Sequence, residues 1–154
     1  MGAIDRRLAA IMVADMEQYS RLMHEDEPGT VLAWQETREE VIKPIIASHS
    51  GNILKNTGDG FVAEFATVSG AVECSVALQA MLMDRNRDRP EGRHLNFRIG
   101  INLGEITVDS DDFYGDGVNI AARLEGLAEA PGICISSHVY DQIRNKVTCK
   151  FEDV

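Results

Sequence analysis

The order of its predicted elements places this chain among mixed α/β proteins of the α+β kind, with helices packed on a mainly antiparallel sheet. Three observations lead to that class: a buried strand near the start, helix-period segments between strands, and two hairpin segments. In chain order we expect strand, helix, hairpin, helix, hairpin, helix, strand, helix and strand. The opening is a ferredoxin-like βαββαβ core, followed by C-terminal additions. That architecture hosts many functions, so it indicates none by itself.

The first strand and the first helix follow from hydrophobic patterning. Residues 7–16 are apolar throughout and closed by Asp15, which predicts a buried strand. Apolar residues then recur at three- and four-residue steps, which predicts an amphipathic helix from Thr30, its expected cap, to about Ser48. Pro44 should loosen the last turn of this helix, because proline lacks the N–H that an α-helix uses.

The remaining elements are expected to follow in quick succession. Residues 51–66 predict a hairpin, because Asp59 and Gly60 both tolerate the positive φ angles of a tight turn. The next helix should bury Val72, Val76 and Leu82. In chain order we expect that helix at 68–88, a strand pair within 91–110, a helix within 114–130, a short strand and a capped helix in 131–143, and a final strand in 146–154.

Length and charge exclude several classes of protein. The 154 residues fit one domain with a sizeable core. A net charge of −10 argues against a general nucleic-acid or anionic-membrane binder, since such proteins carry a basic face. Three widely spaced cysteines predict reduced thiols and a cytoplasmic setting. The apolar run after the N-terminal Arg pair is interrupted by Asp15, so we interpret it as a strand and not as a signal peptide or membrane contact.

Asp15 and Asp59 are the first candidates for a functional site. Asp15 ends the first strand and Asp59 lies in the hairpin turn; a ferredoxin-like sheet places that strand beside that hairpin. Two adjacent carboxylates repel each other unless a cation lies between them, and oxygen ligands suit Mg²⁺ or Mn²⁺. The alternative is a strand-end cap and an ordinary turn residue, and spacing alone favours that alternative.

Three further polar residues stand out from their surroundings. Lys55 precedes the turn, where an edge-strand lysine that deters unwanted pairing is the simpler explanation. Asn119 and Arg123 are four residues apart on one predicted helix, so they share a face. The planar arginine fork suits phosphate oxygens, and the alternative is a surface ion pair of Arg123 with Glu125 or Glu129.

Four motifs in order give these candidates a context: VADMEQYSRLM, KNTGDGF, RIGINLGE and DFYGDGVNIAARLE. Together they resemble the catalytic domain of class III adenylyl/guanylyl cyclases, in a likeness that runs from about Arg7 to the end of the chain. We therefore expect residues 1–154 to be one such domain. Domains of this family usually continue into a final strand that carries another phosphate-binding lysine, so we expect this domain to be cut before that strand.

The resemblance implies a role for each motif. Asp15 and Asp59 match the two metal-binding aspartates, and the Met16 carbonyl matches a position that also touches the metal, with two Mg²⁺ or Mn²⁺ ions per site. Asn119 matches the residue that positions the ribose, and Arg123 matches the transition-state arginine. The turn whose amides hold the triphosphate corresponds to Met16, Glu17, Gln18, Tyr19 and Ser20.

Lys55 and Asp112 match the pair that reads the base, and together they resemble an adenine-reading pair. Guanylyl cyclases typically carry Glu and Cys at these places. The resemblance thus implies an adenylate cyclase in which the 3′-hydroxyl of ATP attacks the α-phosphate, releasing pyrophosphate and forming 3′,5′-cyclic AMP for signalling. The sequence indicates no general base.

Family members act as head-to-tail dimers with composite sites, and one chain that carries every site residue favours a homodimer. Asp59 would then serve one site while Lys55 of the same chain serves the other. An attached regulatory domain in a longer parent protein fits this interpretation. Three alternatives stay open: a guanylate cyclase, a catalytically silent nucleotide-binding or dimerisation module, and a nucleotidyltransferase such as a polymerase palm, which shares the fold and the paired aspartates.

Overall fold

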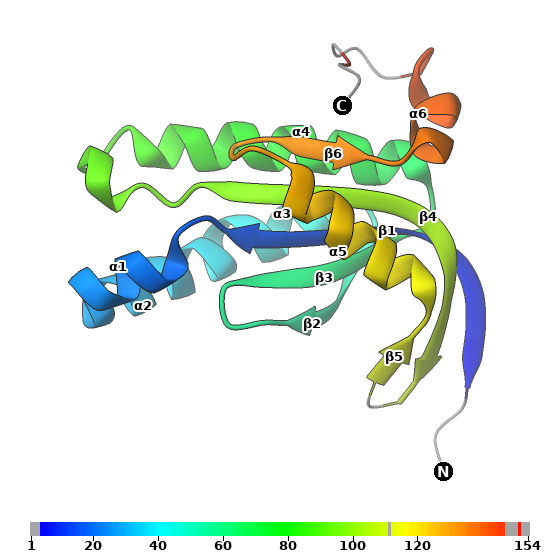
Figure 1. The fold of residues 1–154 in the computed structure, drawn as a ribbon, viewed down its shortest axis with the longest axis horizontal. Helices are drawn as coiled ribbons and strands as arrows, with labels where there is room; N and C mark the ends of the chain where they lie inside the picture. Colours follow the sequence, from blue (N-terminus) through cyan, green and yellow to red (C-terminus); the bar gives the residue numbers. More distant parts are fainter. Residues whose placement is uncertain (1–3, 111, 147–150, 152–154) are drawn as a thin grey trace.

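One mixed sheet organises the chain (Figure 1), and a computed structural model describes residues 4–110, 112–146 and 151. Its strands are β1 (Asp5–Met16), β2 (Gly51–Asn56), β3 (Gly60–Phe65), β4 (Phe97–Asp109), β5 (Asp112–Tyr114) and β6 (Ile133–Ile135). The order across the sheet is β2-β3-β1-β4-β5, with β6 pairing β4 as well. Every pair is antiparallel except β4 with β6. The predicted α+β class and the central position of β1 beside the hairpin are confirmed.

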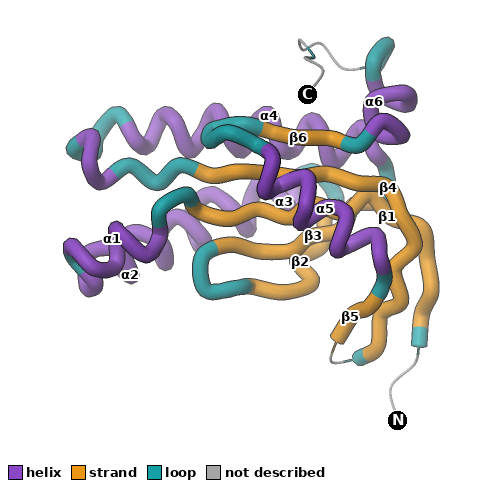
Figure 2. Tube along the Cα trace, viewed as in Figure 1, coloured by secondary structure: helices purple, strands orange, loops and turns teal. Residues whose placement is uncertain are grey.

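Helices cover both faces of this sheet (Figure 2). They are α1 (Tyr19–Glu25), α2 (Glu27–Thr37), the π-helical η1 (Arg38–Ile42), α3 (Lys43–Ser48), α4 (Val68–Asn86), the 3₁₀ turn η2 (Glu91–Arg93), α5 (Asp116–Leu127) and α6 (Ser137–Ile143). The larger hydrophobic cluster joins the sheet to α2, α3, α4 and α6. A smaller cluster joins the other face to α5, which crosses in front of β1 and β4 in Figure 1.

The two clusters explain why the middle of β1, residues 8–14, is apolar at every position. Side chains alternate between the faces of a strand, so a strand covered on both sides must be apolar at every position. Met12 and Ala14 lie in the larger cluster, whereas Ala9 and Ile11 lie in the smaller one beneath α5. The same alternation puts Asp15 on the α5 face, next in line after Ile11 and Val13.

The first long helix begins earlier than its sequence suggests. The Asp26 carboxylate caps α2 by accepting from the Gly29 amide at 3.1 Å, so the expected cap at Thr30 is wrong. Thr30 is buried, and its hydroxyl donates to the Leu22 carbonyl at 2.8 Å. The helix continues through η1 into α3. The widened π-helical turn ends two residues before Pro44, whereas the last turn, where the loosening was expected, is α-helical.

The predicted hairpin is confirmed as β2 and β3, but its glycine has a different purpose. Neither Asp59 nor Gly60 adopts a left-handed φ, so the expected positive angles are wrong. A Cβ on Gly60 would lie 1.8 Å from the Ala14 carbonyl oxygen. Gly60 is therefore needed because β1 and the turn approach each other closely, and this approach brings Asp59 next to the end of β1.

Two other expectations are corrected and one lies outside the described residues. The strand pair expected within 91–110 is a single long strand, β4, whose hairpin partner is β5; only the position of the turn was misjudged. Val76 is 42% exposed on α4, although its period predicted burial. The final strand expected at 146–154 falls almost wholly outside the described residues.

Cys74 and Cys134 are free and buried, as expected of core thiols, and burial raises the pKa of Cys74 to about 12. Cys149 lies outside the described residues. Within the described ranges, each helix is too short or too polar to cross a membrane.

Candidate active site

Pairing of β1 with β3 brings Asp15 and Asp59 to one end of the sheet. Asp15 is opposite Gly60 in the ladder, and the Met16 amide donates to the Asp59 carbonyl at 2.8 Å. Two carboxylates that are 44 positions apart in the sequence thus lie side by side. Burial raises the pKa of the Asp59 carboxyl, and the negative charge of Asp15 raises it further.

Arg98, opposite Asp15 on β4, is a site residue that the sequence did not single out. Its guanidinium donates to Asp15 three times, from Nε at 3.1 Å and from one terminal nitrogen at 2.9 and 3.2 Å. The same Nε lies 3.5 Å from Glu125 Oε2 on α5. Arg98 therefore lies between two acidic side chains, and it neutralises Asp15 more fully than Glu125 because its hydrogen bonds go to Asp15.

Glu125 is the second residue that the sequence analysis misjudged. It was considered as a surface partner of Arg123, but it is buried and faces Arg98. Burial raises the pKa of the Glu125 carboxyl to about 8, and a hydrogen bond to Asp15 and the charge of Asp15 add to the shift. Arg98 lowers the pKa only partly, because its three short hydrogen bonds go to Asp15.

Close packing of α5 on β4 places Glu125 in this cluster. A Cβ on Gly100 would lie 2.3 Å from both the Ala121 carbonyl oxygen and the Glu125 amide nitrogen. Only glycine at this position lets the helix approach β4 so closely. Phe97, Ile99 and Ile101 face the larger cluster, so Arg98 and Gly100 face α5. This alternation was the available signal for Arg98; Glu125 gave none.

The carboxylates present fit a divalent cation that also binds a phosphate ligand. Among the described residues, no three His, Cys, Asp or Glu side chains are grouped as a complete metal site. Mg²⁺ seldom needs such a group, because one or two carboxylates, waters and substrate phosphates commonly complete its six oxygen ligands. Asp15 and Asp59 supply that pair, and their mutual repulsion favours a cation between them.

The chain directly after β1 has two amides already in use. The Met16 amide donates to Asp59 and the Glu17 amide donates to the Asn96 carbonyl at 2.7 Å. Gln18 adopts a left-handed conformation, φ 57°, and turns the chain into α1, which begins at Tyr19. The first amides of a helix have no partner within it, so an anion here would meet Gln18, Tyr19 and Ser20.

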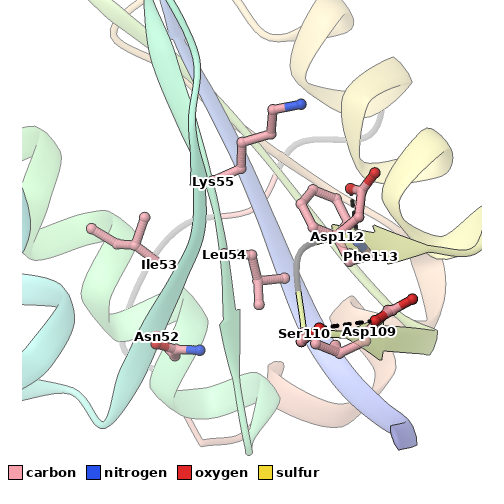
Figure 3. Close-up of a pocket in the computed structure, with 9 residues that line it drawn as sticks. Asn52, Ile53, Leu54, Lys55, Asp109, Ser110, Asp112 and Phe113 are labelled. Carbon is pink, nitrogen blue, oxygen red and sulfur yellow. Dashed lines mark hydrogen bonds between the residues drawn. The ribbon is translucent and has the colours of Figure 1, made fainter. Parts of the chain in front are cut away.

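Lys55 and Asp112 line one hollow of about 310 Å³ between β2 and the β4–β5 hairpin (Figure 3). Figure 3 shows Lys55 on one side of the hollow and Asp112 with Phe113 on the other. Leu54 and Val108 contribute apolar surface. One oxygen of Asp112 accepts from the Phe113 amide at 2.8 Å, which fixes the carboxylate at the rim. The sequence placed these two charges together, and the structure does the same.

Asn119 and Arg123 lie on the exposed side of α5, away from Glu125. Among the described residues, Arg123 forms no ion pair with either Glu125 or Glu129, so the surface pair considered from the sequence is absent. Ile120 and Leu127, also on α5, are exposed as well. Both polar side chains are thus available to a ligand or to another chain.

Comparison with known proteins agrees with this arrangement. A profile of the "Adenylate and Guanylate cyclase catalytic domain" matches residues 5–154. "Putative adenylate cyclase 3" of Rhizobium meliloti (strain 1021) is 44% identical over 98% of this chain, which spans 26% of that relative's length.

Two solved structures extend the comparison. The crystal structure of an adenylate/guanylate cyclase/hydrolase from Silicibacter pomeroyi has a TM-score of 0.92 at 40% identity, covering 99% of this chain and 88% of that one. The adenylyl cyclase CyaB from P. aeruginosa has a TM-score of 0.84 at 23% identity, over 96% and 86% of the two chains, and shares the fold. The chain therefore belongs to the adenylate and guanylate cyclase catalytic domain family.

Proposed function

We propose that this domain is an adenylate cyclase that converts ATP to 3′,5′-cyclic AMP and pyrophosphate. The observation that carries the choice of ATP is the hollow that Lys55 and Asp112 flank. Adenine offers an acceptor ring nitrogen beside a donor amino group, which suits a lysine donor beside a carboxylate acceptor. Guanine offers a ring N–H and the O6 acceptor instead, so its oxygen would face the Asp112 carboxylate or its N–H would face the Lys55 ammonium.

Other residues of the proposed site would bind the metal ions and the triphosphate. Asp15 and Asp59 would hold two Mg²⁺ or Mn²⁺ ions, and the Met16 carbonyl would add a further oxygen ligand. When bound, these ions would lower the pKa of the 3′-hydroxyl and neutralise the departing pyrophosphate. The amides from Gln18 to Ser20, at the start of α1, would orient the triphosphate.

Asn119 would position the ribose, and Arg123 would stabilise the charge that develops on the α-phosphate. In the reaction the 3′-oxygen forms its bond to the α-phosphorus, the bond to the bridging oxygen breaks, and pyrophosphate leaves. The proton of the 3′-hydroxyl goes to solvent, because no described residue identifies itself as a general base. Positioning and electrostatics are sufficient tasks for the protein in such a transfer.

We further propose that the working unit is a homodimer with two composite sites. The support is that the two arginines of the candidate site differ in their partners. Arg98 forms an ion pair with Asp15 within the chain, whereas Arg123 has no acidic partner among the described residues. An unpaired arginine beside the exposed Ile120 and Leu127 fits a surface that meets a ligand held by another copy.

Product identification tests the proposal directly. The purified domain is incubated with ATP or GTP and Mn²⁺, and the products are separated by chromatography. We expect cyclic AMP from ATP, with GTP a poor substrate. Conversion of GTP to cyclic GMP at a rate at least equal to that of ATP would instead identify a guanylate cyclase. A full-length parent that makes neither product from either nucleotide would contradict the cyclase proposal.

A double variant tests the base-reading pair by itself. Lys55→Glu with Asp112→Cys should lower kcat/KM for ATP by about a hundredfold, because each polar mismatch against the bound base is costly, and should raise it for GTP. Asp109→Asn, in the same hollow, is the matched control and should keep the preference for ATP. An unchanged ratio of ATP to GTP in the double variant would exclude Lys55 and Asp112 as base readers.

A further inference from the structure

Trp34, the one tryptophan of the chain, connects the helical layer to the turn that carries Asp59. It lies on α2 and is 3% exposed. Its indole Nε1–H donates to the Gly58 carbonyl oxygen at 3.0 Å, across 24 positions of sequence. A helix on the face opposite α5 therefore bonds to the residue directly before one of the paired carboxylates.

The indole is held in one orientation by its neighbours. Its ring centroid lies 5.5 Å from that of Phe97 on β4. On α2's continuation, the Arg38 guanidinium carbon lies 4.7 Å from the indole centroid, at a cation–π distance. A large side chain fixed by packing on two sides loses no further freedom when it donates, so its hydrogen bond acts as a rigid support.

Besides the indole, the turn is held by two backbone hydrogen bonds and by the Thr57 side chain, whose hydrogen bond to the Asp59 carboxylate lowers the pKa of that carboxyl. Thr57 donates to the Gly60 carbonyl at 3.0 Å, and the Asp59 carbonyl accepts from Met16. A Cβ on Gly58 would meet nothing within 4 Å, so side-chain packing does not fix this residue. The Gly58 carbonyl and the Asp59 amide belong to one planar peptide unit, so holding the carbonyl also fixes the plane from which Asp59 departs.

We infer that Trp34 is a positioning residue for Asp59, holding the turn so that the Asp59 carboxylate stays beside Asp15 when a divalent cation binds. This inference rests on the proposed metal-binding role of Asp59. Trp34 touches neither metal nor nucleotide in this account and acts through the Gly58 carbonyl. Losing the indole N–H should therefore loosen cation binding more than it loosens the fold.

The first test uses the single indole resonance in a ¹H–¹⁵N NMR spectrum of the metal-free domain. Titration with Mg²⁺ should shift this one resonance, because the hydrogen bond joins it to the metal-binding turn. In Asp59→Asn the shift should disappear. A wild-type indole resonance that does not move while other resonances report Mg²⁺ binding would overturn the inference.

The second test measures Mn²⁺ affinity by electron paramagnetic resonance, without any turnover. Trp34→Phe keeps an aromatic ring but lacks the donor, and should weaken Mn²⁺ binding by about fivefold, the equivalent of one net hydrogen bond. Thr37→Val is the matched control, since it removes a buried hydroxyl that donates to the Ala33 carbonyl on the same helix. It should lower thermal stability while leaving the Mn²⁺ affinity near that of the wild type.

The outcomes separate this inference from the proposed function. If Trp34→Phe lowers stability but binds Mn²⁺ as the wild type does, Trp34 is merely structural and the inference is wrong, while a loss of binding in Asp59→Asn keeps the metal site. If Asp59→Asn binds Mn²⁺ as tightly as the wild type, the metal site itself is refuted and the inference falls with it.

Discussion

The charged cluster around Asp15 and the exposed residues Lys55 and Arg123 differ in how many contacts this chain provides for them. Asp15, Arg98 and Glu125 are at least partly buried, come from three elements, and are joined by short hydrogen bonds and an ion pair. Lys55 and Arg123 are exposed. The first group is assembled by the fold of one chain, and the second group faces outward.

This contrast is what the proposed composite site would require. Residues that hold a cation must resist their own repulsion before the cation arrives, so they need internal support. Residues that contact a ligand held by another copy must stay uncommitted until that copy binds.

Asp59→Ala should abolish the proposed cation binding by Asp15 and Asp59 almost completely. Cyclase activity is expected to fall by about a hundredfold or more, because even indirect partners of metal ligands are worth about 10–100-fold. The measurement is kcat with Mn²⁺ and ATP. Asp84→Ala, which removes an exposed carboxylate paired with Arg87 on α4, should retain activity. Equal activities of the two variants would show that the paired carboxylates have no special role.

Mixing two inactive variants tests whether the two groups serve different sites. Asp15→Ala and Arg123→Ala should each be nearly inactive alone. In an equal mixture, random pairing should place one intact site in about half of the dimers, restoring about a quarter of wild-type activity. Activity is measured after exchange, and mixed dimers are verified by native mass spectrometry. If such dimers form and no activity returns, the sites are not shared between chains.

Gly100→Ala should damage the buried group through packing alone. Its methyl group would overlap α5, so we expect a loss of about 1–3 kcal/mol in the free energy of unfolding. Thermal or urea unfolding measures this. Gly126→Ala, on the open side of α5, is the matched control, because its Cβ would meet nothing within 4 Å. Alanine there should stabilise slightly through helix propensity. Equal effects would mean that α5 does not depend on its close approach to β4.

Glu125→Gln should alter how stability depends on pH. The carboxyl binds its proton more tightly in the folded state, with a pKa of about 8 against an ordinary 4.5. Its contribution is therefore complete below about pH 4.5 and is lost as pH rises to about 8. Glutamine cannot ionise, so the Tm of the variant should exceed that of the wild type at pH 9, by about 2–4 °C per kcal/mol, and match it near pH 4.5. Parallel curves across this range would rule out a titrating Glu125.

The elements that one local sequence pattern specifies could be predicted from the sequence. The strand β1, the helix α4 and the β2–β3 hairpin follow from local preferences and burial, and the structure has all three. Features that depend on a contact with another residue could not be predicted in this way. Thr30 resembles a helix cap, but the Asp26 carboxylate caps first and the Thr30 hydroxyl bonds to Leu22.

The same limit applies within the candidate site. Their positions at strand ends, in the turn and on one helix face singled out Asp15, Asp59, Lys55, Asn119 and Arg123 as candidates. The ordered motifs gave them roles and added Asp112. The apolar period of residues 30–48 gave no sign that the Trp34 N–H reaches the Gly58 carbonyl. Glu125 was considered as a surface partner of Arg123, although residues two apart on a helix do not face each other. Glu125 instead shares the buried side of α5 with Gly117 and Ala121.

The sequence by itself determined the order of elements, the family and the candidate residues, because those depend on local preference and on motif spacing. The tertiary structure alone decided that Arg98 and Glu125 join Asp15. Arg98 joins Asp15 through the β1–β4 register, and Glu125 joins them because Gly100 admits α5. Such contacts depend on the register between strands and on how closely a helix approaches the sheet. Neither property can be derived from one segment alone, because each arises only when two distant segments pack together.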